Sequence, residues 1–90
     1  MSITVNVPTQ LSPLTGGMRA VTAEGATLGA VIEDLERKHP GVRDRLLDDR
    51  GVRRFINLFV NDEDARYLGG LDAPLRDGDS VTIVSAVAGG

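Results

Sequence analysis

The sequence predicts a single α+β domain, in which a mixed sheet of about four to five strands carries one main helix on one face. Three observations support this class. Alternating apolar residues near both ends of the chain are typical of half-buried strands, an amphipathic helical pattern lies between them, and a β-rich run follows that helix. The 90 residues suffice for one core and require no second domain.

The first elements are expected to form a hairpin. Alternation from Ile3 to Val7 predicts a strand with one buried face, which Pro8 ends. Residues 9–17 contain hydroxyl side chains, a proline and two glycines, a composition typical of a loop. A second strand is expected around residues 18–23.

The main helix is predicted to begin after Thr27, whose hydroxyl can cap it, and to end before Pro40. Its inward face is expected to consist of Leu28, Val31, Ile32 and Leu35. The pairs with the i,i+4 spacing of helical ion pairs are Glu33–Arg37 and Asp34–Lys38. We interpret these charges as an ordinary solvated face.

The second half of the chain alternates short elements with turns. In order, we expect a short helix at residues 42–47, a polar turn at 48–51, a strand at 55–60, a short strand at 66–68, a turn at 69–70 and a final strand at 80–86. In the final strand, Val81 and Ile83 should face the core. Two hairpin strands, a helix across them, a further strand and a last strand describe a β-grasp domain, the ubiquitin-like arrangement.

The composition excludes several kinds of site. Cysteine is absent, which excludes disulfides, thiolate zinc sites, iron–sulfur clusters and persulfides on this chain. The 10 basic and 13 acidic residues give a formal charge of −3, which argues against nucleic-acid binding. The residue pattern contains no signal peptide and no segment of transmembrane length, so we expect a cytoplasmic protein without membrane contact.

The internal polar residues predict no catalytic or metal site. His39 is interpreted as a surface residue at the helix end, where a positive charge suits the helix dipole. Residues 62–64 carry three carboxylates, but we interpret them as a polar turn rather than a cation site. The glycine pairs at 16–17 and 69–70 lack the lysine of a phosphate-binding loop and are interpreted as turns.

The C-terminal residues Val87, Ala88, Gly89 and Gly90 come directly after the last predicted strand. We expect a β-grasp domain over residues 1–86 and a flexible tail over residues 87–90. Four extended residues reach about 13 Å, at roughly 3.3 Å each, and glycines without a Cβ can enter a narrow channel in another protein. The Gly90 carboxylate is therefore the expected working group, and the three residues before it are expected to bind the channel.

Five segments carry a resemblance to a known family. They are residues 15–17 (Thr-Gly-Gly), 27–32 (Thr-Leu-Gly-Ala-Val-Ile), 60–64 (Val-Asn-Asp-Glu-Asp), 77–79 (Asp-Gly-Asp) and 87–90 (Val-Ala-Gly-Gly). In this order, and over nearly the whole chain, the sequence resembles the ubiquitin-like sulfur carriers of the ThiS and MoaD kind. The resemblance is greatest to the members that serve cysteine biosynthesis.

The resemblance implies that partner enzymes supply the catalysis, whereas the carrier acts as their co-substrate and binds no cofactor itself. A ubiquitin-activating-like adenylyltransferase and sulfurtransferase would use ATP and magnesium to adenylate Gly90, and sulfur would then displace AMP to give a thiocarboxylate. A PLP-dependent cysteine synthase would accept the sulfur, and a metallopeptidase of the JAMM type would release cysteine. A thiosugar-forming synthase, thiamin synthesis or molybdopterin synthesis is the alternative destination.

We expect partners to dock on the outward face of the sheet, beside the tail. The expected patch consists of Phe59, Thr82, Val84 and Ala86, with Arg66 and Arg76 available to acidic groups of a partner. Two other function classes remain open. One is a protein modifier that forms an isopeptide bond through Gly90, for which Lys38 is the only lysine available for self-linkage. The other is a β-grasp interaction module whose terminal glycines have no chemistry.

Overall fold

The computed structural model describes residues 2–85 of the chain. Its elements, with η marking 3-10 helices, are β1 Ser2–Asn6, η1 Ser12–Thr15, β2 Ala20–Glu24, α1 Leu28–Lys38, α2 Val42–Leu46, β3 Leu47–Asp48, β4 Gly51–Val52, β5 Ile56–Val60, β6 Glu63–Asp64, η2 Ala65–Tyr67, η3 Gly70–Asp72 and β7 Ser80–Ser85. The predicted hairpin, both helices and the two later strands are confirmed, with boundaries that shift by about two residues.

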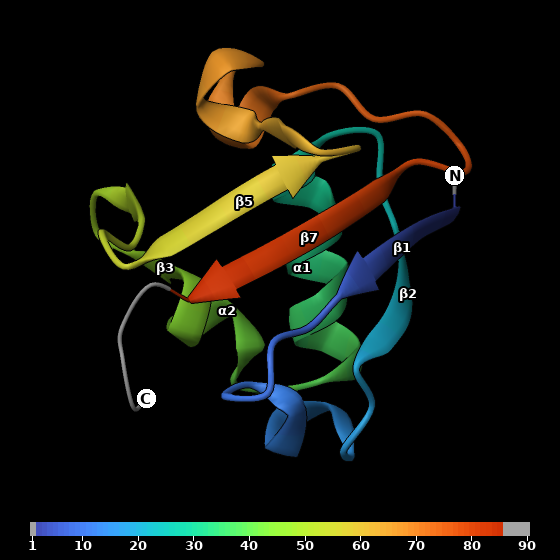
Figure 1. Ribbon diagram of the computed structural model, residues 1–90, viewed down its shortest axis with the longest axis vertical. Helices are drawn as coiled ribbons and strands as arrows, with labels where there is room; N and C mark the ends of the chain where they lie inside the picture. Colours follow the sequence, from blue (N-terminus) through green and yellow to red (C-terminus); the bar gives the residue numbers. More distant parts are fainter. Residues whose placement is uncertain (1, 86–90) are drawn as a thin grey trace.

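Five strands form one mixed sheet in the order β2-β1-β7-β5-β6. Strand β1 pairs with β7 in parallel, and the other neighbours are antiparallel. Figure 1 shows α1 and α2 behind this sheet, while the face toward the viewer carries no helix among the described residues. The predicted β-grasp architecture, a mixed sheet with one main helix on one face, is confirmed.

The core lies between α1 and the sheet. The Thr27 hydroxyl caps α1 by accepting a hydrogen bond of 3.2 Å from the Ala30 amide. The predicted inward face of the helix is buried and packs against alternating strand residues. The cluster includes Leu28, Val31, Ile32 and Leu35 from the helix and Ile3, Val5, Val21, Leu58, Val60, Val81 and Ile83 from the sheet. Burial of this apolar surface is the main force that holds β7 in place.

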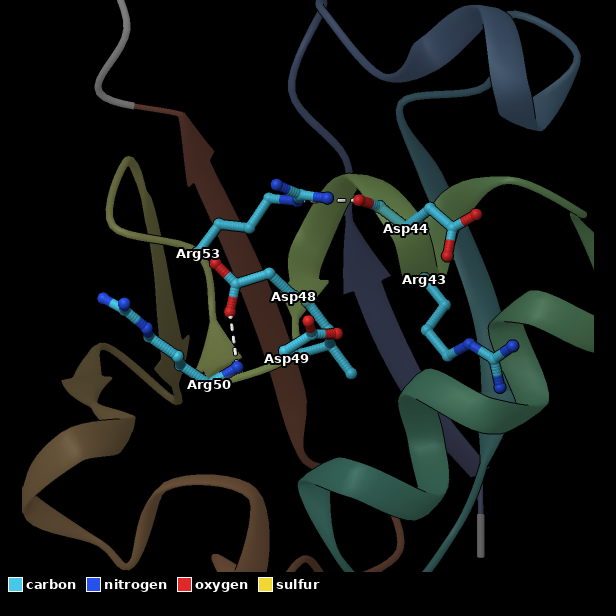
Figure 2. Close-up of a pocket in the computed structure, with 7 residues that line it drawn as sticks. Arg43, Asp44, Asp48, Asp49, Arg50 and Arg53 are labelled. Atoms are coloured by element: carbon cyan, nitrogen blue, oxygen red, sulfur yellow. Dashed lines mark hydrogen bonds between the residues drawn. The ribbon is translucent and has the colours of Figure 1, made fainter.

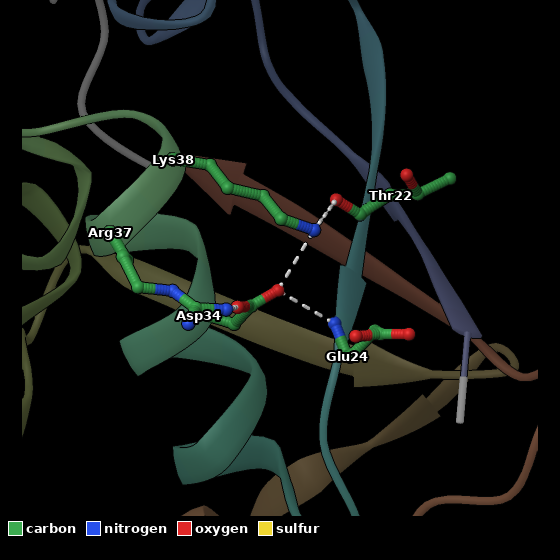
Figure 3. A network of polar contacts seen from close by, with 5 residues as sticks. All are labelled: Thr22, Glu24, Asp34, Arg37 and Lys38. Atoms are coloured by element: carbon green, nitrogen blue, oxygen red, sulfur yellow. Dashed lines mark hydrogen bonds and ion pairs between the residues drawn. The ribbon is translucent and has the colours of Figure 1, made fainter.

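Asp34 departs from the predicted solvated face of α1. Asp34 is only 7% exposed, and its carboxylate accepts a 2.9 Å hydrogen bond from the Glu24 amide on β2. Lys38 lies 3.0 Å from the same carboxylate and Arg37 also pairs with it (Figure 3). The solvated-face interpretation is therefore wrong for Asp34. Helical periodicity could not reveal that β2 runs beside this part of the helix.

The Asp34 contacts also protect an edge of the sheet. Strand β2 is an edge strand, whose outward backbone groups could pair with another chain. The Asp34 carboxylate accepts a hydrogen bond from the Glu24 amide, and Lys38 Nζ donates to the Thr22 carbonyl at 3.5 Å.

The second predicted ion pair on the helix, Glu33–Arg37, is wrong. Glu33 instead pairs with Arg43 of α2 at 2.7 Å, because α2 folds back against α1.

We predict a pH-dependent loss of stability on Asp34→Asn. The Glu24 amide, with Lys38 and Arg37, lowers the pKa of Asp34 from 3.8 to about 2. Because the folded-state pKa is lowered, the carboxylate stabilises the fold fully above about pH 4, and this contribution is lost as the pH falls through about 2. The variant should unfold at a lower temperature than wild type at neutral pH, and the difference should shrink in acid.

Thermal unfolding followed by circular dichroism at several pH values measures this difference. Glu63→Gln is the matched control, since Glu63 is exposed and its substitution removes one charge in the same way. A difference between wild type and Asp34→Asn that stays constant from neutral pH to acid would contradict the prediction.

Two local expectations in the second half of the chain have different outcomes. The short strand predicted at residues 66–68 is wrong, because Ala65–Tyr67 forms a 3-10 helix whose first turn is capped by the Asp64 carboxylate, 2.9 Å from the Arg66 amide. The polar turn at 48–51 is confirmed, and it closes a hairpin of β3 and β4 that was not predicted. Strands of two residues are too short to show the alternation of apolar and polar residues by which a strand is predicted.

The predicted boundary between the domain and the tail lies outside the described residues.

Candidate functional site

The strand that leads to the C-terminal residues lies at the centre of the sheet, between β1 and β5. Val81 and Ile83 of β7 are buried in the core as predicted, so packing holds in place the strand that precedes the C-terminal residues. Ser85, opposite Ile56 of β5, is the last described residue. The predicted tail residues Val87, Ala88, Gly89 and Gly90, and Ala86 of the expected docking patch, lie outside the described residues.

Two of the motif segments meet at the start of β7. Asn61 and Asp62 have φ values of 49° and 74° and form the two-residue turn between β5 and β6, as in a type I′ hairpin. The Asn61 side chain donates to the Asp79 carboxylate at 2.9 Å and accepts from the Ser80 amide at 3.0 Å. The hydrogen bond from the Arg76 amide, and then that from Asn61, lowers the pKa of Asp79. These residues therefore position β7.

Phe59, Thr82 and Val84 of the expected docking face lie on the outward face of the sheet, which is less apolar than their sequence suggests. Phe59 lies opposite Thr82, while Val84 lies opposite Asn57, so the two apolar side chains are diagonal neighbours. Val84 is 39% exposed and Phe59 is half-buried. Asn6 Nδ2 donates to the Thr82 hydroxyl at 3.2 Å, which adds a polar pair to the middle of this face.

The two arginines expected at the rim lie at the end of the sheet where β7 begins. Arg66 is exposed and pairs with Asp64 at 2.7 Å, and this contact lowers the pKa of Asp64 and raises that of Arg66. Arg76 is exposed in the loop before β7. The structure thus brings Phe59, Thr82 and Val84 together, whereas Arg66 lines a separate pocket with Arg53, Arg54 and Ile56.

A different set of residues lies beside Ser85. The groove at this end of the sheet is lined by Gln10, Leu11, Asp44, Arg45, Arg53, Phe55, Ile56 and Ser85. Phe55 is 55% exposed. The sequence analysis placed Phe55 at the start of a predicted strand, and it did not select the arginines. The signal was present in the sequence, because five arginines fall within residues 43–54.

A second hollow continues from this groove along α2 and the β3–β4 hairpin. Figure 2 shows Arg43, Arg50 and Arg53 arranged around Asp48 and Asp49. Arg53 Nε donates to the Asp44 backbone carbonyl at 2.7 Å, and the Asp48 carboxylate accepts from the Arg50 amide at 2.8 Å. The hollow is open and charged, a surface suited to protein contact rather than to enclosing a small molecule.

Between residues 2 and 85, no three His, Asp or Glu side chains converge as a metal-binding group. In the same part of the chain, none of the helices has the length and apolar character needed to cross a bilayer. The arrangement offers a rigid strand leading to the C-terminal residues, with one open sheet face and one arginine-rich end beside it.

Comparison with known proteins assigns the chain to a family. The ThiS family model matches residues 5–90. The sulfur carrier protein CysO of Mycobacterium tuberculosis is 54% identical over 93 residues, covering all of both chains. Small archaeal modifier protein 3 of Haloferax volcanii is 36% identical over 67 residues, covering 74% of this chain and 73% of that protein.

A solved structure agrees with the sequence comparison. The crystal structure of the BexX/CysO complex of Amycolatopsis orientalis contains a chain that superposes with a TM-score of 0.93 at 50% identity, covering 98% of this chain and 99% of that one. The resemblance inferred from the five sequence segments is confirmed. The chain therefore belongs to the ThiS family of ubiquitin-like sulfur carriers.

Proposed function

We propose that this sulfur carrier holds its sulfur as a thiocarboxylate at Gly90. The observation that carries the proposal is the 54% identity to a sulfur carrier protein over the full length of both chains. The absence of cysteine is consistent with it, because no internal thiol competes for the transferable sulfur.

The chemistry requires activation before sulfur transfer. A carboxylate oxygen of Gly90 attacks the α-phosphorus of ATP, and pyrophosphate leaves with magnesium-assisted charge neutralisation in the activating enzyme. Hydrosulfide then attacks the acyl carbon, a carbon–sulfur bond forms, and AMP leaves as the carbon–oxygen bond breaks. A persulfide is the alternative donor: its terminal sulfur attacks the acyl carbon as AMP leaves, and a thiol of the sulfur-donating enzyme then attacks the donor's other sulfur, forming a disulfide and releasing the thiocarboxylate. This chain contributes the acyl group and its presentation, and the activating enzyme contributes the catalytic groups.

Presentation of Gly90 depends on the position of β7. The five residues after Ser85 span at most about 18 Å when extended, at roughly 3.3–3.6 Å per residue. An activating enzyme can therefore hold the body while the chain end reaches its nucleotide. We propose that the open sheet face with Phe59, Thr82 and Val84, together with Ala86, is one docking surface, with Arg66 and Arg76 at its far end.

Cysteine biosynthesis is the favoured destination of the sulfur, because the relative with 54% identity is a CysO. In this scheme a PLP-dependent cysteine synthase accepts the sulfur from Gly90, and a JAMM-type metallopeptidase releases cysteine after an S-to-N acyl shift. Thiosugar, thiamin and molybdopterin synthesis remain alternative acceptors. The complex of BexX with a CysO is a precedent for such a carrier binding another protein.

A second candidate function is protein modification through an isopeptide bond at Gly90. It is supported by the 36% identity to small archaeal modifier protein 3. Both functions begin with the same adenylated carboxylate, and they differ in whether sulfur or a lysine amine attacks it.

Intact-mass spectrometry separates these functions. The protein is incubated with the activating enzyme, ATP, magnesium and sulfide, and its mass is compared with a reaction lacking ATP. A carrier should show ATP-dependent replacement of one oxygen by sulfur. A covalent adduct with another protein, without the sulfur product, would favour the modifier, and an unchanged mass would contradict both.

A further inference from the structure

The segments near the two ends of β7 differ in net charge. Residues 61–79 lie at the end of the sheet where β7 begins, and they contain six acidic and two basic residues, a net charge of −4. Residues 43–54 contain five arginines and three aspartates, a net charge of +2, and from this segment Asp44, Arg45 and Arg53 line the groove at Ser85, where β7 finishes. The overall charge of −3 therefore conceals a positive end, which is the end at Ser85.

Most arginines of this basic end, defined as Arg43, Arg45, Arg50, Arg53 and Arg54, are available to a partner. Within residues 2–85, only Arg43 among them forms an ion pair, with Glu33. The other four are exposed. The Arg54 guanidinium lies 5.9 Å from the centre of the Phe55 ring, and the Arg53 side chain donates from Nε to the Asp44 carbonyl. Their positive charges can attract carboxylates of a partner.

Apolar surface lies next to these charges. Leu11, Phe55 and Ile56 line the groove beside Ser85, with Arg45 and Arg53 at the same groove. Exposed Phe55 beside Arg54 presents an aromatic ring and a cation together, a combination enriched at protein interfaces. An acidic residue next to an apolar one on another protein would complement this groove.

We propose that the basic end is a docking surface for the activating enzyme, and that this enzyme presents carboxylates and an apolar side chain around the mouth of the channel that takes up the chain end. The inference rests on the proposed function, which requires such a partner. Attraction of the basic end, combined with repulsion of the acidic end, would orient the carrier with Ser85 toward the channel before contact.

The double variant Arg45→Gln/Arg54→Gln tests this proposal with the activating enzyme as the partner. The rate of thiocarboxylate formation is measured by mass spectrometry against carrier concentration, at low and high salt. At low ionic strength we expect kcat/KM to fall about tenfold, with kcat unchanged at saturating carrier, because rim charges act mainly on association. The difference should shrink at high salt because screening weakens long-range attraction.

Two matched variants complete the design. Ala26→Glu/Ala30→Glu makes the same change of net charge at two exposed positions outside the groove beside Ser85, of which Ala26 accepts a hydrogen bond from the Leu75 amide and Ala30 lies in the first turn of α1. Arg45→Lys/Arg54→Lys keeps the charge and removes only the guanidinium shape. We expect kcat/KM of both to stay within about twofold of wild type.

The outcomes distinguish a docking role of the basic end from a general effect of net charge and from failure of the proposed function. An equal loss in the Ala26→Glu/Ala30→Glu variant would show an effect of net charge and would overturn the basic end as a docking surface. An Arg45→Gln/Arg54→Gln carrier loaded as fast as wild type at low salt would overturn it too, while wild-type loading would leave the proposed function standing. Absence of loading in wild type would instead contradict the proposed function and, with it, this inference.

Discussion

Deletion of Gly90 is expected to abolish formation of the thiocarboxylate while leaving the fold intact. The shortened chain still ends in a carboxylate, but that carboxylate stops about 3.3–3.6 Å short of the nucleotide. A misplacement of about 1 Å can already cost a hundredfold in rate, so we expect a loss of at least that size. The fold should persist because the buried core of the described residues extends only from Ile3 to Ile83.

Two measurements test this deletion. Intact mass after incubation with the activating enzyme, ATP and sulfide reports loading, and thermal unfolding reports stability. Gly90→Ala is the control, since it keeps the chain length and adds one Cβ at the terminal residue. We expect it to be loaded more slowly than wild type but faster than the deletion. A deletion variant that is loaded at the wild-type rate would exclude Gly90 as the sulfur-bearing residue.

The largest effect on stability is expected from Ile32→Ala. Ile32 is 1% exposed at the centre of α1 and packs in the cluster that joins the helix to the sheet. Truncation to alanine removes buried methyl and methylene groups and leaves a cavity, which costs about 2–5 kcal/mol of unfolding free energy. Urea denaturation followed by circular dichroism measures the loss.

Ile32→Val provides the control for this substitution. It removes one methylene group at the same position and should cost about 0.5–1.5 kcal/mol. A value for Ile32→Ala below that of Ile32→Val would contradict the packing described for α1. Because small domains have a total stability of roughly 5–15 kcal/mol, the alanine variant should also show a larger unfolded fraction at elevated temperature.

The inward faces of the helix and strands were predictable because they depend on local periodicity. Leu28, Val31, Ile32 and Leu35 recur at helical spacing, and Val81 and Ile83 lie two residues apart on one face of a strand, so burial of these faces is expected from the pattern. The Thr27 cap was predictable for the same local reason. The short η2 helix was not, because the Asp64 cap outweighed the weak strand preference of residues 66–68.

The candidate site was likewise predictable only in the parts that depend on neighbouring residues in the sequence. The Gly-Gly sequence and the five motif segments indicate the family without any tertiary information, and the family is confirmed. The expected docking face was assembled from strand alternation alone, and alternation predicts which side a residue faces but not its cross-strand neighbours. The polar pair of Asn6 and Thr82 therefore appeared only with the sheet register.

The sequence by itself determined the fold class, the buried faces and the family, since periodicity, capping residues and motif order are properties of neighbouring positions in the chain. Only the tertiary structure decided that Asp34 is buried against β2, that Asn61 fixes Asp79 at the start of β7, and that Arg45 and Arg53 lie beside Ser85. Each of these contacts joins residues 10 or more positions apart. Such contacts depend on how the strands are ordered and on which side the helices cross them, and neither can be read from local sequence.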